Sequence, residues 1–195
     1  MIAIIDYKMG NLRSVENALR RLGAEFCVTA DPDIITRATH VILPGVGSAD
    51  EAMANLHAAG LPPVIRGLRR PVLGICLGMQ VLCRDSEEGG FTPCLGLFDA
   101  HVRRFTPTPE LKVPHMGWNR LGNMESKLLR GLERGASVYF VHSYFAHTCP
   151  DTIATTEHGQ LFSAALKYEN FYGTQFHPEK SGEVGEQILK NFLAL

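Results

Sequence analysis

One cysteine of the chain lies between two glycines in a pattern typical of a nucleophile. Residues 74–78 read GICLG, with Cys76 at the centre of a G-x-nucleophile-x-G motif. A nucleophile at a sharp strand-to-helix turn has strained backbone, so Gly74 and Gly78 would let neighbouring chain pass without a Cβ atom in the way. The alternative is a buried structural cysteine between two turn glycines, because free cysteine is among the most buried residue types.

The neighbouring residues predict the strand and the helix that such a turn needs. The apolar run 72–75 is typical of a buried strand, and residues 79–84 are predicted to begin a helix. The unpaired N–H groups at the first turn of that helix would favour a thiolate at Cys76. The N–H of Leu77 would then be available to bind an oxyanion.

A base and a carboxylate that can orient it lie near the end of the sequence. His177 and Glu179 are separated by one proline, and residues i and i+2 of extended backbone share a face. The carboxylate can therefore orient the imidazole, and attack by a thiol needs such a base. Alone, this pair also fits two solvated side chains at a strand end. Together with Cys76 it predicts a Cys-His-Glu triad.

A second glycine-rich turn, PGVG at residues 44–47, follows the apolar run 40–43. Ser48 and Glu51 form an S-x-x-E capping box that predicts a helix over residues 52–59. Loops of this kind present backbone N–H groups to anions, although a plain tight turn is the alternative. Ligands of parallel sheets bind at the carboxyl ends of the strands, so this loop and Cys76 are expected to converge.

The order of elements predicts an α/β fold of three layers, a mostly parallel sheet flanked by helices. A helix ending near Gly23 and a helix capped at Asp31 alternate with the early strands, at residues 2–5, 25–29, 40–43 and 72–75. Short runs then predict a mixed, mostly antiparallel extension, at residues 95–98, 100–105, 137–145, 152–156 and 162–166. A strand at 171–176 and a helix at 182–194 complete one predicted domain, residues 1–195, without a linker or internal repeat.

Composition limits the classes of partner and compartment. The 19 Lys and Arg nearly balance the 20 Asp and Glu, so we expect neither nucleic acid nor a membrane surface as partner. The sequence shows neither a secretory signal nor an apolar run long enough to span a membrane, which predicts a cytoplasmic protein. The five cysteines form no C-x-x-C pair, so neither a disulfide framework nor a metal site is expected; they are Cys27, Cys76, Cys83, Cys94 and Cys149.

The cysteine and histidine motifs together resemble those of the class I (triad) glutamine amidotransferases, at residues 74–80 (GICLGMQ) and 175–179 (QFHPE). Further motifs narrow the resemblance to the glutaminase subunits of imidazole glycerol phosphate synthase, in histidine biosynthesis. These motifs are MGNLRS at 9–14, PGVG at 44–47, PHMGWN at 114–119, YFVHSY at 139–144 and HPEKS at 177–181. The resemblance runs from end to end of the chain.

This resemblance implies a reaction that needs no cofactor. Cys76 would attack the side-chain amide of L-glutamine, and His177, oriented by Glu179, would pass the proton to the leaving ammonia. Water would then hydrolyse the glutamyl thioester. The oxyanion would be bound by N–H groups of Leu77 and of the loop residues Val46 and Gly47. The substrate is expected at Gly45, Gly47, Gln80, Glu88, Ser143 and Tyr144, with Glu88 pairing with the α-ammonium group.

The resemblance also implies a partner, the (β/α)₈-barrel cyclase subunit of imidazole glycerol phosphate synthase, in a heterodimer that receives the ammonia. With 195 residues, this chain falls short of the roughly 250 that such a barrel takes. The expected interface consists of Asn11, His115, Met116, Trp118, Asn119 and Lys180. Lys8 departs from the family pattern, because a small residue is expected in its turn. Partner binding is expected to raise a weak basal activity by reorienting the PGVG loop.

Two alternatives follow from the same residues. One is a glutaminase of another pathway, such as the partner of pyridoxal phosphate synthase, for which PGGES is expected at this loop, whereas PGVG occupies residues 44–47 here. The other is a catalytically silent regulatory module that keeps the fold. Such relatives usually lack a member of the triad, whereas Cys76, His177 and Glu179 are all present here.

Overall fold

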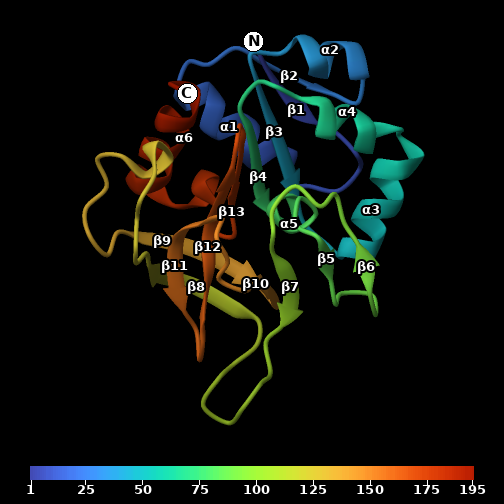
Figure 1. Cartoon of the computed structure of the whole chain (residues 1–195). Helices are drawn as coiled ribbons and strands as arrows, with labels where there is room; N and C mark the ends of the chain where they lie inside the picture. Colours follow the sequence, from blue (N-terminus) through green and yellow to red (C-terminus); the bar gives the residue numbers. More distant parts are fainter.

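The computed structural model describes residues 1–195 and is built around a seven-stranded sheet of order β11-β12-β13-β4-β3-β1-β2 (Figure 1). Five neighbouring strands are parallel: β13 (Phe171–Thr174), β4 (Val72–Cys76), β3 (His40–Gly45), β1 (Ile2–Ile5) and β2 (Phe26–Thr29). Two further strands, β12 (Leu161–Tyr168) and β11 (Thr152–Glu157), add to β13 in antiparallel fashion. The predicted α/β fold with an antiparallel extension is confirmed.

Helices cover both faces of the sheet. One face packs against α2 (Pro32–Arg37), α3 (Ala49–Ala58) and α4 (Leu61–Gly67), and the other against α1 (Leu12–Arg21) and α6 (Gly182–Leu193) (Figure 1). Side chains of β1 show why both faces are apolar. Ala3 and Ile5 belong to one core cluster and Ile4 to the other, because successive side chains of a strand point to opposite faces.

The remaining strands form two smaller sheets beyond the carboxyl ends of β3 and β4 (Figure 1). The first has the order β10-β7-β5-β6, with β10 (Tyr144–Ala146), β7 (His101–Arg104), β5 (Asp85–Ser86) and β6 (Thr92–Pro93). The second is the antiparallel pair of β8 (His115–Arg120) and β9 (Ser137–His142). Two 3-10 turns, η1 (Lys127–Leu129) and η2 (Pro178–Lys180), complete the chain. The site can therefore form between these sheets and the strand ends.

Three local predictions are wrong. The helix after Cys76 is a single turn, α5 (Leu77–Gln80), and ends before Arg84 because the chain turns there into β5. Ser48 makes no capping hydrogen bond. Instead the carboxylate of Glu88 accepts one from the N–H of Ala49, at the start of α3, at 2.9 Å. Residues 95–98 form no strand.

Other local predictions are confirmed by the backbone. Asp31 caps α2 by accepting hydrogen bonds from the N–H groups of Asp33 and Ile34, and Gly23 adopts φ 67° just after α1. Lys8 has φ 66°, a left-handed conformation that glycine adopts at no steric cost, which explains why a small residue is expected there. Two further elements, α4 and β8, are present that the sequence patterns do not predict.

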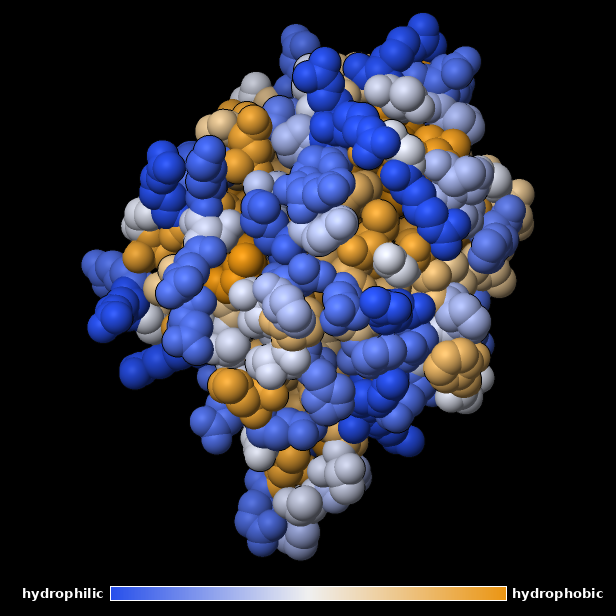
Figure 2. Space-filling view, viewed as in Figure 1, coloured by the Kyte–Doolittle hydropathy of each residue, from blue (hydrophilic) through white to orange (hydrophobic).

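The surface seen in Figure 2 is mostly hydrophilic, with apolar residues in separate patches. None of the helices combines the length and the apolar character that a membrane crossing requires. All five cysteines have free thiols.

Candidate active site

Cys76 lies at the turn between β4 and α5 with φ 54° and ψ −111°. This is a strained conformation for a residue with a side chain. A Cβ atom on Gly78 would overlap the carbonyl oxygen of Leu43, and one on Gly74 would lie 2.6 Å from the carbonyl oxygen of Gly78. The turn that holds the sulfur therefore requires both glycines, for the steric reason that the motif suggests.

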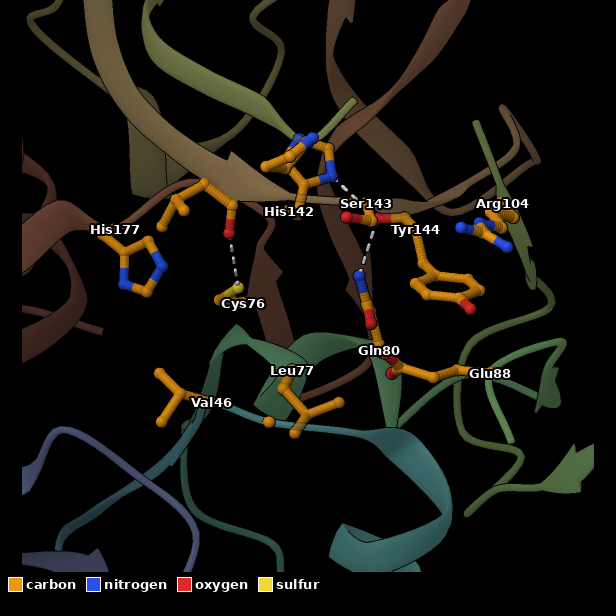
Figure 3. Close-up of a pocket in the computed structure, with 13 residues that line it drawn as sticks. Val46, Cys76, Leu77, Gln80, Glu88, Arg104, His142, Ser143, Tyr144 and His177 are labelled. Carbon is orange, nitrogen blue, oxygen red and sulfur yellow. Dashed lines mark hydrogen bonds between the residues drawn. The ribbon is translucent and has the colours of Figure 1, made fainter. Parts of the chain in front are cut away.

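The sulfur of Cys76 lies between a hydrogen-bond acceptor and a donor. Its thiol donates to the carbonyl oxygen of Val141 at 3.9 Å, and the side-chain amide Nε2 of Gln175 donates to Sγ at 3.7 Å. Gln175 follows β13, the parallel neighbour of β4, and is completely buried. The sulfur is therefore held from two sides, and Figure 3 shows it facing a cavity.

His177 and Glu179 form a buried pair beside Cys76. Nδ1 of His177 donates to Oε1 of Glu179 at 2.8 Å, and both side chains are only 2% exposed. The other ring nitrogen, Nε2, is buried without a hydrogen-bond partner, and the ring lies next to Cys76 (Figure 3). The backbone of His177 is also fixed, since its N–H donates to the carbonyl of Tyr139 and its carbonyl accepts from the hydroxyl of Ser181.

The protonation of His177 depends on the two anionic groups that flank it. Burial by itself would lower the pKa of His177, but negative charge on Cys76 and the carboxylate of Glu179 outweigh it and raise the pKa to about 10. The ring is therefore an imidazolium at neutral pH when the sulfur is a thiolate. Such a pair can attack an electrophilic carbon and then deliver a proton to a leaving group.

A cavity of about 450 Å³ opens beside the sulfur. Its lining includes most of the residues that the sequence predicts for the site, namely Val46, Gly47, Cys76, Leu77, Gln80, Glu88, Ser143, Tyr144 and His177. In Figure 3 Cys76 and His177 lie at one end, and Glu88 and Arg104 lie at the other. A nucleophile and a set of charged groups thus occupy opposite ends of one cavity.

Two acceptors at the far end suit an ammonium group. Both N–H bonds of the Gln80 amide are used, by the carbonyl of Tyr144 and by Oε1 of Gln175, each at 2.9 Å. The Oε1 of Gln80 is therefore left to accept a hydrogen bond. Burial raises the pKa of Glu88, an effect that the N–H of Ala49 partly offsets by stabilising the carboxylate.

Arg104 is a cavity residue that the sequence analysis missed. Its guanidinium has no hydrogen bond or ion pair within the chain, whereas its neighbour Arg103 pairs with Asp85 and Glu87. A cation with no partner at the end of the cavity can bind a carboxylate. The sequence Arg103-Arg104 does not by itself indicate a binding residue, because only the register of β7 decides which of the two arginines faces the cavity.

The loop after β3 approaches the cavity with only part of its length. Val46 and Gly47 line the cavity, with Gly47 at φ 105°. Gly45 instead pairs with Cys76 across β3 and β4 and lines a small adjoining recess with Asn11, His177 and Glu179. Of the predicted substrate contacts, Gly45 is thus the one that the structure leaves outside the main cavity.

The predicted interface residues on β8 point alternately outward and inward, as successive side chains of a strand do. Met116 and Trp118 are 64% and 58% exposed, whereas His115 is 5% exposed. His115 points inward, where Nδ1 lies 2.9 Å from Nε2 of His142 and Nε2 accepts from the side-chain amide of Asn119. Its side chain is therefore not part of the exposed surface. Elsewhere on the predicted interface, Asn11 is half-buried and Lys180 exposed.

The chain is similar to known proteins along almost its whole length. A family model described as glutamine amidotransferase class-I matches residues 3–195. The imidazole glycerol phosphate synthase subunit HisH of Bacteroides fragilis is 54% identical over 195 residues, covering 100% of this chain and 99% of that protein. The subunit of the same name from Xanthomonas oryzae pv. oryzae is 50% identical and covers 100% of this chain and 97% of that protein.

Solved structures share the fold. A glutamine amidotransferase from Thermotoga maritima has a TM-score of 0.67 at 19% identity, covering 99% of this chain and 82% of that one. PurLQS from the same organism has a TM-score of 0.73 at 19% identity, covering 99% and 97%. With a family model and full-length relatives in agreement, the chain belongs to the class I glutamine amidotransferases, in the branch of the HisH subunits of imidazole glycerol phosphate synthase.

Proposed function

We propose that Cys76, His177 and Glu179 hydrolyse L-glutamine to glutamate and ammonia, and that the ammonia passes to a (β/α)₈-barrel cyclase subunit of imidazole glycerol phosphate synthase. The observation that carries this proposal is the position of Cys76 and His177 at one end of a cavity whose other end has unpaired charged groups. The family to which the chain belongs supports it.

The cavity suits the length and the charges of glutamine. The side-chain amide would lie at Cys76, and the α-ammonium at Glu88 and Oε1 of Gln80. The α-carboxylate would lie at Arg104, with Ser143 and Tyr144 beside it. A carboxylate and a guanidinium at the far end would reject neutral amides that lack the amino-acid group, because their charges would be left unpaired.

In this proposal the sulfur of Cys76 attacks the amide carbon, and the carbonyl oxygen becomes an oxyanion. The N–H groups of Leu77 and of Val46 or Gly47 stabilise the charge, and loss of one such donor costs about 10²- to 10³-fold in rate. His177 donates its Nε2 proton to the leaving ammonia and then accepts a proton from the water that hydrolyses the thioester. Glu179 orients the ring through Nδ1.

The route of the ammonia is part of the proposal. The recess lined by Asn11, Val46, His177 and Glu179 adjoins the cavity at Val46 and His177, and leads towards Asn11 of the proposed interface. Met116, Trp118, Asn119 and Lys180 would extend that interface. We further propose that residues 1–195 act as a single domain in the cytoplasm, where the five thiols stay reduced.

The test uses the complex of this chain with the cyclase subunit of the same organism. Cys76→Ala should abolish synthesis with glutamine, while synthesis from added ammonium salt continues at the wild-type rate. Retention of glutamine-dependent synthesis would reject Cys76 as the nucleophile. Loss of both activities would mean that the substitution disturbs the complex, which gel filtration of the two chains checks.

The same assay addresses the two alternatives. A catalytically silent module would leave glutamine unused even in the wild-type complex. A glutaminase for pyridoxal phosphate synthase would bind another partner, and the relatives reported above are HisH subunits instead. The isolated chain is expected to hydrolyse glutamine weakly and to gain activity with the cyclase, whereas full activity alone would contradict the activation by the partner.

A further inference from the structure

Gln175 lies between the proposed nucleophile, Cys76, and Gln80, which lines the cavity. Its side chain is completely buried, with Oε1 accepting from Nε2 of Gln80 at 2.9 Å and Nε2 donating to Sγ of Cys76 at 3.7 Å. A buried amide is normally satisfied by oxygen or nitrogen partners. Here one of its donors is directed at a sulfur that the proposed reaction uses.

The orientation of the Gln175 amide follows from one group that can only accept hydrogen bonds. The carbonyl of Tyr144 lies 2.9 Å from the amide of Gln80, so the Gln80 atom beside it must be the nitrogen. That nitrogen also lies 2.9 Å from Gln175, so the Gln175 atom facing it must be the oxygen. The nitrogen of Gln175 is therefore the atom that faces Cys76.

The carbonyl of Tyr144 is itself held by a second donor. Nδ1 of His142 lies 2.7 Å from it, so Nδ1 carries the proton and Nε2 accepts from Nδ1 of His115 at 2.9 Å. Burial lowers the pKa of His142 to about 3 and that of His115 to about 4, which keeps both rings neutral at pH 7. The carbonyl of Tyr144 thus accepts from both His142 and Gln80, and from Gln80 onwards each amide donates towards the sulfur.

Cys76 has few other groups that favour its anionic form. The helix that follows, α5, has only one turn, and the carbonyl of Val141 accepts from the thiol and so favours the protonated form. The titratable groups nearest the sulfur are His177, backed by Glu179, and Tyr7, whose buried hydroxyl has no partner. Across the cavity are Glu88 and Arg104. Of these, only His177 brings a positive charge close to the sulfur.

We propose that Gln175 is a further catalytic residue, whose amide N–H donates to the sulfur of Cys76 and stabilises the thiolate, and that Gln80 is a positioning residue that fixes the orientation of that amide. This inference rests on the proposed function, in which Cys76 is the nucleophile. It gives Gln80 two tasks, because its Oε1 faces the substrate site while its Nε2 holds Gln175.

The test follows alkylation of Cys76 by iodoacetamide as a function of pH, with the modified peptide quantified by mass spectrometry. Only the thiolate reacts, so the midpoint of the rate profile reports its stability. Gln175→Leu should move the midpoint up by about one to two pH units, which makes alkylation about 10- to 100-fold slower below both midpoints. Gln175→Glu, of nearly the same shape, should also move it up, since a carboxylate disfavours a neighbouring anion.

Controls separate this effect from general loss of structure. Gln160→Leu, at an exposed position, should leave the midpoint unchanged. Gln80→Met should also raise it, and combining Gln80→Met with Gln175→Leu should add nothing to Gln175→Leu alone, because Gln80 acts through Gln175. Circular dichroism checks that each variant folds. If Gln175→Leu does not fold, Gln175→Glu and Gln80→Met carry the test.

An unchanged midpoint in folded Gln175→Leu or Gln175→Glu would overturn the inference. Alkylation requires no turnover of glutamine, so this result is distinguishable from failure of the proposed function. A wild-type complex that cannot use glutamine, combined with the expected shift in midpoint, would reject the function and leave the contact between amide and sulfur in place. Normal use of glutamine with no shift in the midpoint would support the proposed function and reject the role of Gln175.

Discussion

The ion pair that we propose between Cys76 and His177 depends on the negative charges that flank the imidazole, on the sulfur and on Glu179. Nδ1 of His177 is committed to Glu179 at 2.8 Å, so Nε2 is the nitrogen available for proton transfer. Burial opposes a charged ring, and the anionic sulfur more than compensates for it. Each partner therefore sets the protonation state of the other, as is usual for coupled groups.

Removing the sulfur should reveal this coupling. In Cys76→Ala the burial of His177 remains while the negative charge is gone, so the pKa of His177 should fall from about 10. Nitrogen-15 NMR of the imidazole as a function of pH measures the pKa in both proteins. The wild-type ring should stay protonated through neutral pH, whereas the variant ring should lose its proton at lower pH. An equal pKa in the two proteins would contradict the pairing.

Arg104 should contribute to binding of the substrate rather than to the chemical step. Because its guanidinium has no partner within the chain, Arg104→Ala should raise KM for glutamine about tenfold with little change in kcat. Steady-state kinetics of the complex measure both constants. Arg134→Ala, at an exposed position away from the cavity, serves as the control. A fall in kcat at constant KM would assign Arg104 another role.

At the scale of elements, the turn between β4 and α5 leaves no room for a side chain at residue 78. Gly78→Ala would force a Cβ atom into the carbonyl of Leu43, within the strand that pairs with β4. We expect a loss of about 2 kcal/mol or more in the free energy of unfolding, measured by chemical denaturation. Gly67→Ala, where a Cβ atom meets nothing within 4 Å, should change stability little. Equal effects would refute the steric argument.

Helices and strands that are determined by neighbouring residues could be predicted from the sequence. The apolar strands β1, β3 and β4 follow from short buried runs, and the cap of α2 follows from Asp31 before a proline. The sequence marks Ser48 as the residue before α3, but the hydrogen bond at this helix start could not be predicted, because the N–H of Ala49 donates to Glu88, which lies 39 positions further along the chain. The length of α5 depends likewise on the turn into β5.

The candidate site likewise contains residues that the sequence predicts and residues that only the folded structure shows. Motifs mark Cys76, His177 and Glu179, because their chemistry fixes residue type and spacing. No motif separates Arg104 from Arg103, and burial of His115 depends on the register between β8 and β9. Contacts such as that between Gln175 and the sulfur join residues 99 positions apart and appear only once the sheet has formed.

At the scale of the whole molecule, two buried histidines link stability to pH. The pKa values of His142 and His115 in the folded chain are about 3 and about 4, below the roughly 6.5 of an unfolded histidine. At a pH between the folded and the unfolded pKa values, the unfolded chain binds more protons than the folded chain. The free energy of unfolding should therefore fall as pH decreases from about 6.5 to 4. His177, with its raised pKa, acts oppositely and loses its stabilising contribution only as pH rises towards about 10.

Denaturant unfolding at several pH values between 4 and 7 measures this dependence. His142→Phe places an apolar ring among Phe105, Phe140 and Phe162, and removes one titrating group. The variant should be less stable at pH 7, because the carbonyl of Tyr144 loses a donor, but its stability should depend less steeply on pH. An unchanged slope would show that His142 does not govern the acid response.

Acid quenching of the complex during turnover of glutamine, followed by mass spectrometry of its peptides, tests most directly whether Cys76 is the residue that glutamine acylates. One glutamyl group is expected as a thioester on the peptide that contains Cys76, and none on the peptides of the other four cysteines. In Cys76→Ala no glutamyl adduct should form. A glutamyl group on another residue, or turnover that continues in Cys76→Ala, would show that Cys76 is not the nucleophile.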